Sequence, residues 1–445
     1  MNAEQPSMGG DPQRIVIVGG GAGGLELATR LGHKLGRKGL ASIKLIDRNR
    51  THIWKPLLHE VATGTLDTGT QSVSYFAHGA RHGYQFELGE LTDVDVHNKT
   101  LTLAPRKNRS GEQLQQPRTI EYDQLILAFG SISNDFGIAG IQQHCYMLDS
   151  LSQAERFHTA LIDQFTDIHQ NRPGDSLRIA IVGAGATGVE LSAELYKVTE
   201  LLTSYGMAGM SQQQLEVNLI EAGPRVLPAL PERISASVSR ELGELGVKIK
   251  TSVVVSAADE NGLLTKDGER IDADLMVWAA GVKAPDFVRN ISGLSLTRSN
   301  QIAVNEFLQA TDAERNVIKD LWIIGDCAAS IGADGKQVPP RAQSAHQMAS
   351  NVLENLLARR KGKPMKGFQY HDHGSLVSLS SYSAVGTLMG NLTRKSMFVE
   401  GNMARLFYIS LYRLHQLAIH GKVRGALIVA ADWLTKAIKP KMKLH

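Results

Sequence analysis

The glycine-rich stretch GGGAGG, which begins at Gly19, constrains the fold of this chain more than any other feature. It follows an apolar run, Ile15–Val18, typical of a buried strand, and leads into Leu25–Ala28, which can open a helix. Gly19, Gly21 and Gly24 stand at G-x-G-x-x-G spacing. The first glycine permits a tight turn, the second lets backbone approach a pyrophosphate, and the third lets helix and strand pack closely. This order predicts a dinucleotide-binding unit.

An acidic residue completes this first unit. The next apolar run, Ile43–Ile46, ends at Asp47, whose carboxylate can bind the hydroxyl groups of a ribose. The N-terminus of the helix faces the phosphates. The candidate cofactor-binding residues of this unit are Gly19, Gly21, Gly23, Gly24 and Asp47. A purely structural glycine turn is the less favoured interpretation, because strand, helix and acid occur in the expected order.

The same arrangement occurs a second time. Leu177–Val182 indicates a strand, Gly183, Gly185 and Gly188 repeat the glycine spacing, and a later apolar strand ends at Glu221. The gap from the last glycine to this acid exceeds the usual ~20 residues, and a polar insert accounts for the excess. Two chance copies of the whole order are improbable, so the chain is predicted to bind two dinucleotides.

Two later segments also match each other. Tyr122–Gly130 and Ile271–Gly281 each contain aspartate, then an apolar strand, then glycine. Gly130 and Gly281 would therefore place backbone beside the two ligands. The predicted fold class is α/β, with two three-layer Rossmann-like dinucleotide-binding domains.

Glu221 indicates which nicotinamide cofactor the second unit prefers. Its charge would repel a 2′-phosphate, so we expect NADH rather than NADPH. Arg225, four residues on, would weaken that preference if it faced the ligand, although a surface loop cation is the simpler interpretation. Two dinucleotides in one chain suggest hydride transfer between nicotinamide and flavin.

Cysteine usage excludes several classes of protein. The 445 residues leave room for two or three domains, yet they include only two cysteines, Cys145 and Cys327, far apart. This excludes a disulfide framework and a C-x-x-C redox pair. No metal-binding motif was identified. No uninterrupted apolar stretch reaches the ~20 residues that span a bilayer.

The C-terminal segment, residues 401–445, accounts for the net positive charge of the chain. It has eight Lys or Arg against one acid, Asp432, whereas the whole chain has a net charge of +4. On a helix, one face would carry Phe407, Leu411, Leu414 and Ala418, and the other Arg405, Arg413, Gln416 and His420. With the lysines from Lys436 to Lys443, this pattern predicts an interfacial anchor on an anionic lipid surface, each cation contributing roughly 1 kcal/mol. A helix packed on its own protein or on a second subunit, as in a homodimer, is the alternative. No nucleic-acid-binding motif accompanies the charge.

Five segments resemble one family, the type II NADH:quinone oxidoreductases, and its bacterial members in particular. They are Trp54–Gly64, Gly183–Glu194, Gly325–Ala328, Pro339–Met348 and the tail Lys439–His445. The resemblance covers essentially the whole chain. It implies FAD at the first glycine loop and NADH, the substrate, at the second. It also implies a respiratory enzyme of the electron transport chain that passes hydride from NADH to FAD and then two electrons to membrane ubiquinone or menaquinone, without proton pumping. Peripheral attachment to the cytoplasmic face of the cell inner membrane is implied as well.

The resemblance also implies domain boundaries and site residues. Residues 1–150 and 306–370 would form the FAD-binding domain, 151–305 the NADH-binding domain, and 371–445 the membrane-attachment module. Further FAD contacts would come from Lys55, Gly64, Gly130, Asp326, Ala342 and Gln343. NADH contacts would come from Gly183, Gly185, Gly188, Glu190, Glu221 and Gly281.

Three residues are the catalytic candidates. Gln343 and Gln347 belong to a segment similar to the family's A-Q-x-A-x-Q motif and, four apart, would share a helix face on which their amides can bond a quinone carbonyl. Surface glutamines on an ordinary helix are the alternative. Glu190, expected in the first turn of the second dinucleotide helix, would position substrate or pass protons, or would merely complement the helix dipole. His346 is adjacent but off the glutamine face.

Other functions remain open at this stage. Related enzymes that use paired thiols, such as sulfide:quinone oxidoreductases and disulfide reductases, are disfavoured because Cys145 and Cys327 form no motif. A soluble NADH reductase of a ferredoxin-like or other protein acceptor would use the basic tail for docking. A flavin-binding NADH sensor without turnover is the third candidate.

Overall fold

The computed structural model describes residues 12–108, 110–207, 211–380, 383–389, 396–438 and 442. Two compact units make up the chain. The first comprises Met1–His52, Val73–Ser131 and Ala284–Tyr370. The second comprises Ile53–Ser72, Ile132–Lys283 and His371–His445. Each unit is thus assembled from three separate stretches of sequence and contains its own parallel sheet.

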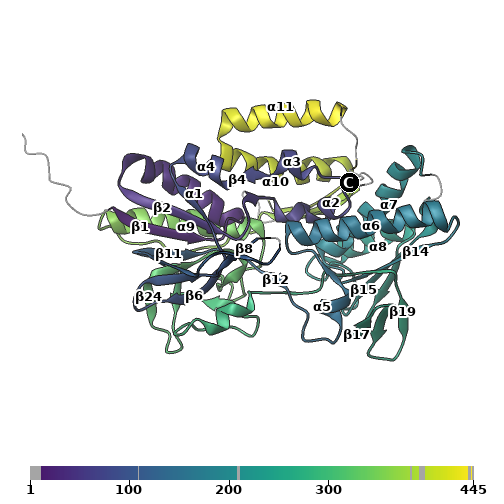
Figure 1. The fold of residues 1–445 in the computed structure, drawn as a ribbon, viewed down its shortest axis with the longest axis horizontal. Coiled ribbons are helices and arrows are strands. Elements are labelled where there is room, and N and C mark those ends of the chain that lie inside the picture. The colour runs from purple at the N-terminus through teal and green to yellow at the C-terminus, as the bar shows by residue number, and fades with distance from the viewer. Residues whose placement is uncertain are drawn as a thin grey trace, which may run out of the picture. The chain divides into compact units, whose positions relative to one another are not determined.

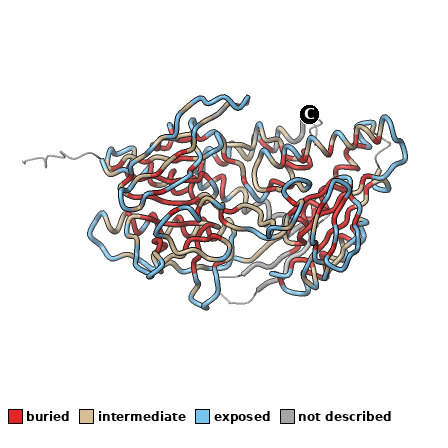
Figure 2. The backbone as a smooth tube through the Cα atoms, turned by 60° about the horizontal axis from the view of Figure 1, so that its bottom comes forward, coloured by how far each residue is buried: buried red, intermediate tan, exposed pale blue. Residues whose placement is uncertain are grey.

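The first unit is built on a six-stranded sheet. In spatial order its strands are β23 (Gln309–Thr311), β24 (Val317–Ile323), β11 (Gln124–Leu127), β1 (Gln13–Val18), β2 (Ala41–Asp47) and β5 (Gln85–Leu88). Only β23 runs antiparallel to its neighbour. Ile17 lies opposite Leu45 and Ile126, and all three are buried. The central strands β1 and β11 are mostly apolar and buried, because elements cover both faces of the sheet, and much of this region is red in Figure 2.

Three helices and a small antiparallel sheet complete the first unit. The helices are α1 (Ala22–Lys34), α4 (Tyr75–His82) and α9 (Ala342–Arg360), and α1 packs against α9 (Figure 1). The small sheet consists of β10 (Arg118–Glu121), β7 (Thr100–Leu103) and β6 (Leu91–Asp95). Short strands are β3 (Thr51–His52), β4 (Val73–Ser74), β8 (Arg106–Lys107), β9 (Gln113–Gln115), β22 (Ile302–Ala303) and β25 (Ala328–Ala329).

The second unit contains a five-stranded sheet in which every pairing is parallel. The order is β13 (Tyr146–Met147), β20 (Leu275–Trp278), β14 (Leu177–Val182), β15 (Leu215–Glu221) and β16 (Lys248–Thr251). Its helices are α2 (Leu58–Ala62), α3 (Thr68–Gln71), α5 (Ile141–His144), α6 (Leu151–Asn171), α7 (Ala186–Ser204) and α8 (Glu232–Leu245). Its other strands are β12 (Ile132–Ser133), β21 (Val282–Lys283), β17 (Val255–Asp259), β18 (Gly262–Thr265) and β19 (Arg270–Asp272). The predicted pair of Rossmann-like units is therefore confirmed.

The C-terminal part of the second unit is a three-stranded antiparallel sheet followed by two helices. The strands are β26 (Gly374–Leu379), β27 (Ser383–Met389) and β28 (Ser396–Glu400), and the helices are α10 (Gly401–His420) and α11 (Lys422–Ile438). The helices lie side by side (Figure 1). Within the described ranges, no helix combines the length and apolarity needed to cross a bilayer. Lys439, Lys441 and Lys443, and the side chains of Arg405, Phe407, Leu411 and Lys436, lie outside what the structure describes.

Candidate dinucleotide-binding sites

The first glycine loop joins β1 to α1, and its first and last glycines leave no room for side chains. Gly19 has φ +105°, and a Cβ there would stand 2.6 Å from the Cα of Phe129. A Cβ on Gly24 would overlap the carbonyl oxygen of Gly19. Gly21 caps α1, and a Cβ on it would have no neighbour within 4 Å. The loop is therefore tight against the sheet and open above the helix N-terminus, where a phosphate group fits.

Asp47, at the end of β2, closes on this loop as the sequence predicts. Its Oδ2 accepts the Gly20 N–H at 2.7 Å, and its Oδ1 accepts the Asn49 N–H at 2.7 Å. Burial raises the pKa of Asp47, although these hydrogen bonds partly lower it. A carboxylate holds about four acceptor positions, so capacity remains for ribose hydroxyls. The open loop, the helix N-terminus and this acid fit the ADP portion of FAD.

Two residues that sequence reasoning missed hold the loop from the other side. Tyr75 donates its hydroxyl to the Gly20 carbonyl at 2.7 Å, and His52 Nδ1 lies 2.9 Å from the same oxygen. A Cβ on Gly20 would stand 2.5 Å from Cε1 of the Tyr75 ring, so glycine is needed here. These residues come from α4 and β3, far from the loop in sequence, where no motif marks them.

Asp326, which is predicted to contact FAD, lies with the loop that follows β11. Ser131 donates to Asp326 Oδ2 at 2.7 Å, and Gln301 donates to the Asp326 carbonyl at 2.8 Å. Gly130 has φ +75°, and a Cβ on it would have no neighbour within 4 Å. The carboxyl ends of β11 and β24 thus present an acid and open backbone at one edge of the sheet.

Helix α9 begins at Ala342 and carries the quinone-motif residues. Ser344 and Ala345 are buried, whereas Gln343 and Gln347 are half-exposed on a common face. A Cβ on Gly23 would stand 2.8 Å from the Ala345 carbonyl oxygen, so Gly23 is what lets α9 approach α1. The motif's small residues therefore fix the helix on the first unit and leave its amides accessible.

Beside this face, His346 Nδ1 pairs with Glu26 of α1. Glu26 also pairs with Arg30 at 2.9 Å. Burial raises the pKa of Glu26, but the pairing with His346 and Arg30 prevails and lowers it overall. This buried carboxylate is therefore held charged, and it ties α9 to α1.

The second glycine loop repeats the geometry of the first. Gly183 has φ +103°, and a Cβ there would stand 2.7 Å from the carbonyl carbon of Ala279. A Cβ on Gly188 would overlap the Gly183 carbonyl oxygen. Gly185 caps α7, and a Cβ on it would have no neighbour within 4 Å. This loop is likewise tight against its sheet and open above its helix.

Glu221 occupies the place that Asp47 has in the first unit. Its two oxygens accept the N–H groups of Ala184 and Gly223, both at 2.8 Å. Arg225 donates to the carbonyls of Leu230 and Pro228 at 2.7 and 3.0 Å. Since those bonds tie the guanidinium to its own loop, Arg225 does not offset the charge of Glu221 directly.

Glu190 differs from its predicted position. It is the fifth residue of α7 and 5% exposed, so it lies beyond the first turn and the helix-dipole interpretation fails. Its Oε2 lies 3.5 Å from His59 Nδ1, and its Oε1 accepts the Ser378 N–H at 3.1 Å. One turn on, Glu194 accepts the Thr65 hydroxyl at 2.7 Å. Burial lowers the pKa of His59, and the Glu194 charge partly restores it.

The remaining predicted residues lie in the second unit. Lys55 opens a short 3-10 turn and is exposed, whereas Gly64 is buried with φ +76°. Both were predicted to contact FAD, and that assignment stays a prediction. Gly281 has φ +68° and lies under the Phe136 ring, whose Cζ would be 2.6 Å from a Cβ on the glycine.

The two cysteines do not form a thiol centre. Cys145 belongs to the second unit and Cys327 to the first, and neither forms a disulfide. Burial raises the pKa of each thiol to about 12. A thiol at that pKa holds little thiolate near neutral pH, so both are poor nucleophiles.

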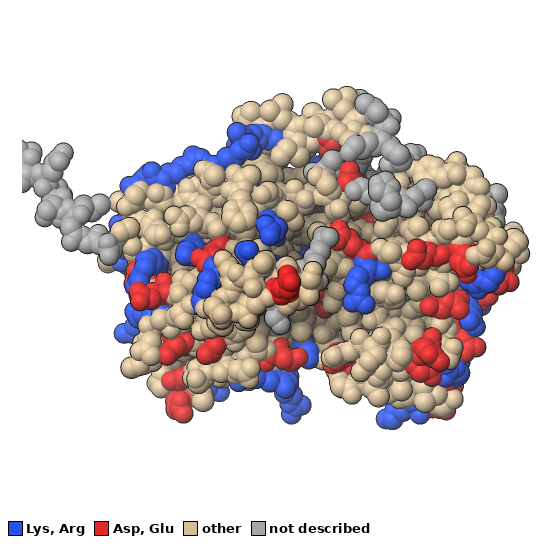
Figure 3. All heavy atoms as spheres, in the orientation of Figure 1, with Lys and Arg blue, Asp and Glu red and all other residues tan. Residues whose placement is uncertain are grey.

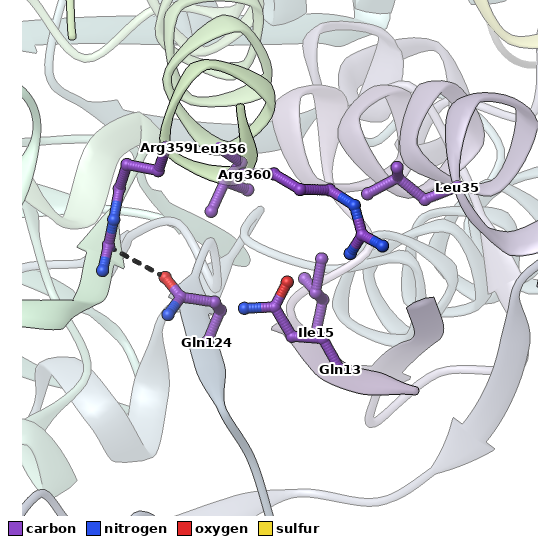
Figure 4. Close-up of a pocket in the computed structure, with 7 residues that line it drawn as sticks. All are labelled: Gln13, Ile15, Leu35, Gln124, Leu356, Arg359 and Arg360. Atoms are coloured by element: carbon purple, nitrogen blue, oxygen red, sulfur yellow. Dashed lines mark hydrogen bonds between the residues drawn. The ribbon is translucent and has the colours of Figure 1, made fainter. Parts of the chain in front are cut away.

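A small pocket in the first unit lies at the opposite edge of its sheet. It is lined by Gln13, Ile15, Leu35, Gln124, Leu356, Arg359 and Arg360 (Figure 4). Gln13 and Gln124 begin β1 and β11, so the pocket is at the amino ends of the strands. Arg359 donates to Gln124 Oε1 at 3.2 Å and pairs with Asp320 at 3.1 Å. Ligands of such sheets bind at the carboxyl ends, so this pocket is not a dinucleotide site.

Comparison with known proteins places the chain in a family. The pyridine nucleotide-disulphide oxidoreductase family matches residues 13–349. A type II NADH:quinone oxidoreductase of Haemophilus influenzae is 46% identical, over 97% of this chain and 100% of that protein. One of Staphylococcus aureus is 28% identical, over 86% and 91%. The solved structure of NDH2 from Plasmodium falciparum with NADH has a TM-score of 0.78 at 18% identity, covering 97% of this chain and 100% of that one. The chain belongs to the type II NADH:quinone oxidoreductases, within the pyridine nucleotide-disulphide oxidoreductase family.

Proposed function

We propose that the first unit holds FAD, that the second binds NADH, and that residues of α9 receive the quinone. The protein oxidises NADH and reduces a quinone, with FAD as cofactor. The observation that carries the proposed assignment is the duplication of one geometry, a tight glycine loop closed by Asp47 or Glu221. Membership in the family supports FAD and NADH as the two dinucleotides.

FAD, when bound, accepts a hydride from nicotinamide and passes two electrons to quinone. The protein's residues bind and orient the reactants. The Gly185 cap of α7 faces the NADH pyrophosphate, and Glu221 holds the adenosine ribose and repels a 2′-phosphate. Gln343 and Gln347 donate amide hydrogens toward a quinone carbonyl, since both stand half-exposed on α9.

Glu190 and His59 hold a proton near the reacting groups in this proposal. Quinone reduction by NADH consumes one proton beyond the hydride, so the protein must deliver it. The buried imidazole and carboxylate face each other at 3.5 Å. Burial lowers the pKa of His59, so a proton that its imidazole takes up is released more readily than from an ordinary histidine.

Stopped-flow absorbance tests both halves of the reaction. NADH is mixed anaerobically with purified protein, and a short-chain ubiquinone analogue follows. We expect rapid bleaching of the flavin band by NADH, much slower bleaching by NADPH, and rapid recovery with quinone. Bleaching without recovery would assign the electrons to a protein acceptor and contradict the quinone site.

The C-terminal helices are the proposed membrane-contacting surface. They expose large apolar side chains, with exposures of 60% at Leu414, 77% at Val423, 65% at Leu427 and 55% at Leu434, and the cations Lys422 and Arg424 are exposed at the start of α11. In Figure 3 the middle of the surface over α11 is tan, with Lys or Arg atoms at its left end. The inward side is polar: Asp432 is buried, accepts from Gln71 at 2.6 Å and pairs with Arg413, and His415 stacks on Trp54 at 4.2 Å.

An amphipathic helix with polar groups inward and leucines outward requires an apolar partner. A lipid surface suits it because quinone is dissolved there, and attachment to the cytoplasmic face of the bacterial inner membrane is part of this proposal. Flotation with anionic liposomes tests it, comparing wild type, Leu427→Asp and a control, Leu264→Asp, on β18. We expect only L427D to stop floating. If wild type fails to float and L427D instead dissociates a dimer, the face is a subunit interface.

A further inference from the structure

A turn in the second unit places a phenyl ring in an unfavourable backbone conformation. Phe136 and Gly137 have φ of +52° and +70° and occupy the centre of a turn that Ile138 N–H closes on the Asp135 carbonyl at 3.0 Å. Two successive positive φ values are normally supplied by glycine, asparagine or aspartate. A bulky residue at such a position is an outlier and indicates strain.

The ring is nevertheless held in a defined place. It lies over Gly281, where a Cβ would stand 2.6 Å from Phe136 Cζ. Its edge meets Trp278 with ring centroids 6.5 Å apart. The backbone beneath is fixed by Asn134, whose carbonyl accepts from Trp278 Nε1 at 2.8 Å. Phe136 itself remains 62% exposed, so the strained backbone conformation buries little of the ring.

The ring also adjoins the second glycine loop. Gly281 follows β20, and the preceding residue, Ala280, stands with its N 2.7 Å from where a Cβ of Gly183 would be. All strands of this sheet are parallel, so β20 and β14 end at the same edge. Phe136 therefore lies at the carboxyl edge, where nucleotides bind in this type of sheet.

Strand order indicates which half of the dinucleotide the ring would meet. The order is β13-β20-β14-β15-β16, so β15 and β20 flank the strand that leads into the loop. Glu221, at the end of β15, is on the adenosine side, which leaves β20 and Gly281 on the nicotinamide side. Gly130 is the residue of the first unit that matches Gly281, and a Cβ on it would have no neighbour within 4 Å. Of these two glycines, only Gly281 is therefore covered by a ring.

We infer that Phe136 forms one wall of the NADH site and contacts the nicotinamide half of the bound dinucleotide. This rests on the proposed binding of NADH to the second unit. The ring presents an apolar face that stacks on a nicotinamide or covers its ribose, and the strained turn holds that face over Gly281. Phe136 is a binding and positioning residue, and no chemical step passes through it.

Substitutions that relax the turn separate binding from structure. Phe136→Asn and Phe136→Gly place residues that tolerate positive φ at this position. Full-length holoenzyme is mixed with NADH anaerobically, and the concentration dependence of bleaching gives Kd and the limiting rate. We expect the Kd for NADH to rise about 10-fold in both variants, equal to about 1.4 kcal/mol. Reoxidation by the quinone analogue and the thermal midpoint should stay unchanged, or the midpoint should rise.

Leu264→Asn is the matched control, because Leu264 is an exposed apolar residue, at 40%, on β18 of the same unit. Its Kd for NADH should equal that of wild type. An unchanged Kd in F136N would overturn the inference. So would a fall of several degrees in the thermal midpoint of F136N, which would identify the ring as a structural cover for Trp278. If NADH fails to bleach the wild-type flavin, the proposed function itself fails, which is a distinct result.

Discussion

The two glycine loops are near copies that differ in how far the chain encloses them. Gly19 and Gly183 have φ of +105° and +103°, and each donates its N–H to the end of the next strand, at 2.8 and 2.7 Å. Near the start of β1 and of β14, an arginine pairs with the aspartate that precedes the later strand, Arg14 with Asp123 at 3.0 Å and Arg178 with Asp274 at 2.7 Å. The same loop conformation, backbone hydrogen bond and ion pair therefore occur in both dinucleotide-binding units.

The differences lie in what packs on each loop. In the first, Tyr75 and His52 bond the second loop residue, and Gly23 admits α9. In the second, Ala184 stands where the first has Gly20, and its carbonyl accepts the Leu227 N–H at 2.8 Å. Thr187, in the place of Gly23, is exposed. The first loop is thus enclosed by its own unit, which suits a cofactor that stays bound. The second is more open, which suits a substrate that must exchange at every turnover.

Both dinucleotide helices also carry a buried glutamate at their fifth position, and each meets a histidine. Glu26 pairs with His346 and with Arg30. Glu190 has His59 at 3.5 Å and the Ser378 N–H at 3.1 Å. A carboxylate with a permanent cation beside it stays charged, whereas one facing an imidazole of lowered pKa can share a proton. The first pair joins helices, and the second is the one suited to proton transfer.

Valine at the last glycine of each loop should produce the largest effects and separate the two ligands. A Cβ at Gly24 or Gly188 would overlap a loop carbonyl oxygen, and overpacking of this kind costs about 1–3 kcal/mol or more. We expect Gly24→Val to lose FAD on purification. We expect Gly188→Val to keep FAD but to lose bleaching by NADH. The ratio of flavin to protein absorbance and anaerobic stopped-flow measure these outcomes.

Circular dichroism establishes whether each valine variant retains the fold. Loss of FAD from folded Gly188→Val, with retention in Gly24→Val, would reverse the assignment of the units.

Replacing each buried glutamate should separate the structural role of the Glu26–His346 pair from the proton-transfer role of the Glu190–His59 pair. Glu26→Gln leaves Arg30 without its counterion and removes the carboxylate that His346 contacts. We expect a loss of about 2–3 kcal/mol in the free energy of unfolding, less than for a fully buried pair because Arg30 is 36% exposed. Glu190→Gln should cost about 1 kcal/mol or less, because burial lowers the pKa of His59 and so weakens any ion pair between the two side chains. Urea titration measures both.

In kinetic measurements Glu190→Gln should have the larger effect of the two variants, whereas Glu26→Gln has the larger effect on stability. Glu190→Gln should slow flavin recovery by quinone about 10- to 100-fold, within the range of a lost proton donor, and leave bleaching by NADH intact. Equal recovery rates in wild type and E190Q would remove Glu190 from the proton path.

Charge at the end of β15 should decide between NADH and NADPH. Glu221→Gln removes the repulsion of a 2′-phosphate, worth about 1–3 kcal/mol, so the NADH to NADPH ratio of kcat/KM should fall about 10- to 100-fold. The ratio is informative because loss of the Ala184 contact affects both cofactors. Glu216→Gln, on the same strand and paired with Lys248 at 2.7 Å, is the control and should leave the ratio unchanged. An unaltered ratio in E221Q would place the adenosine ribose elsewhere.

The sequence predicted whatever depends on neighbouring residues and missed whatever the fold brings together. Glycine spacing and terminal acids found both loops, because turn geometry and strand ends are local properties. The glycine pattern predicts Glu190 in the first turn, but it does not locate a helix start to within a residue, and α7 begins at Ala186. Tyr75, His52 and His59 were missed as loop and glutamate partners, since their contacts span many positions and carry no motif. Asp432 was counted only as a charge, yet it is the buried group that docks α11.

The hydroxyl of Tyr75 offers the smallest and most direct test of loop enclosure. Tyr75→Phe removes one hydrogen bond to Gly20 but keeps His52, so retention of FAD should weaken by about 1 kcal/mol, or roughly fivefold in Kd. Tyr84→Phe loses a comparable buried bond, to His78 at 2.9 Å, without touching the loop. Both variants should lose similar stability, but only Y75F should release FAD faster on dilution. If Y84F releases FAD equally fast, general loosening of α4 rather than the Gly20 contact retains the cofactor, and the contrast between an enclosed and an open loop would rest on α9 alone.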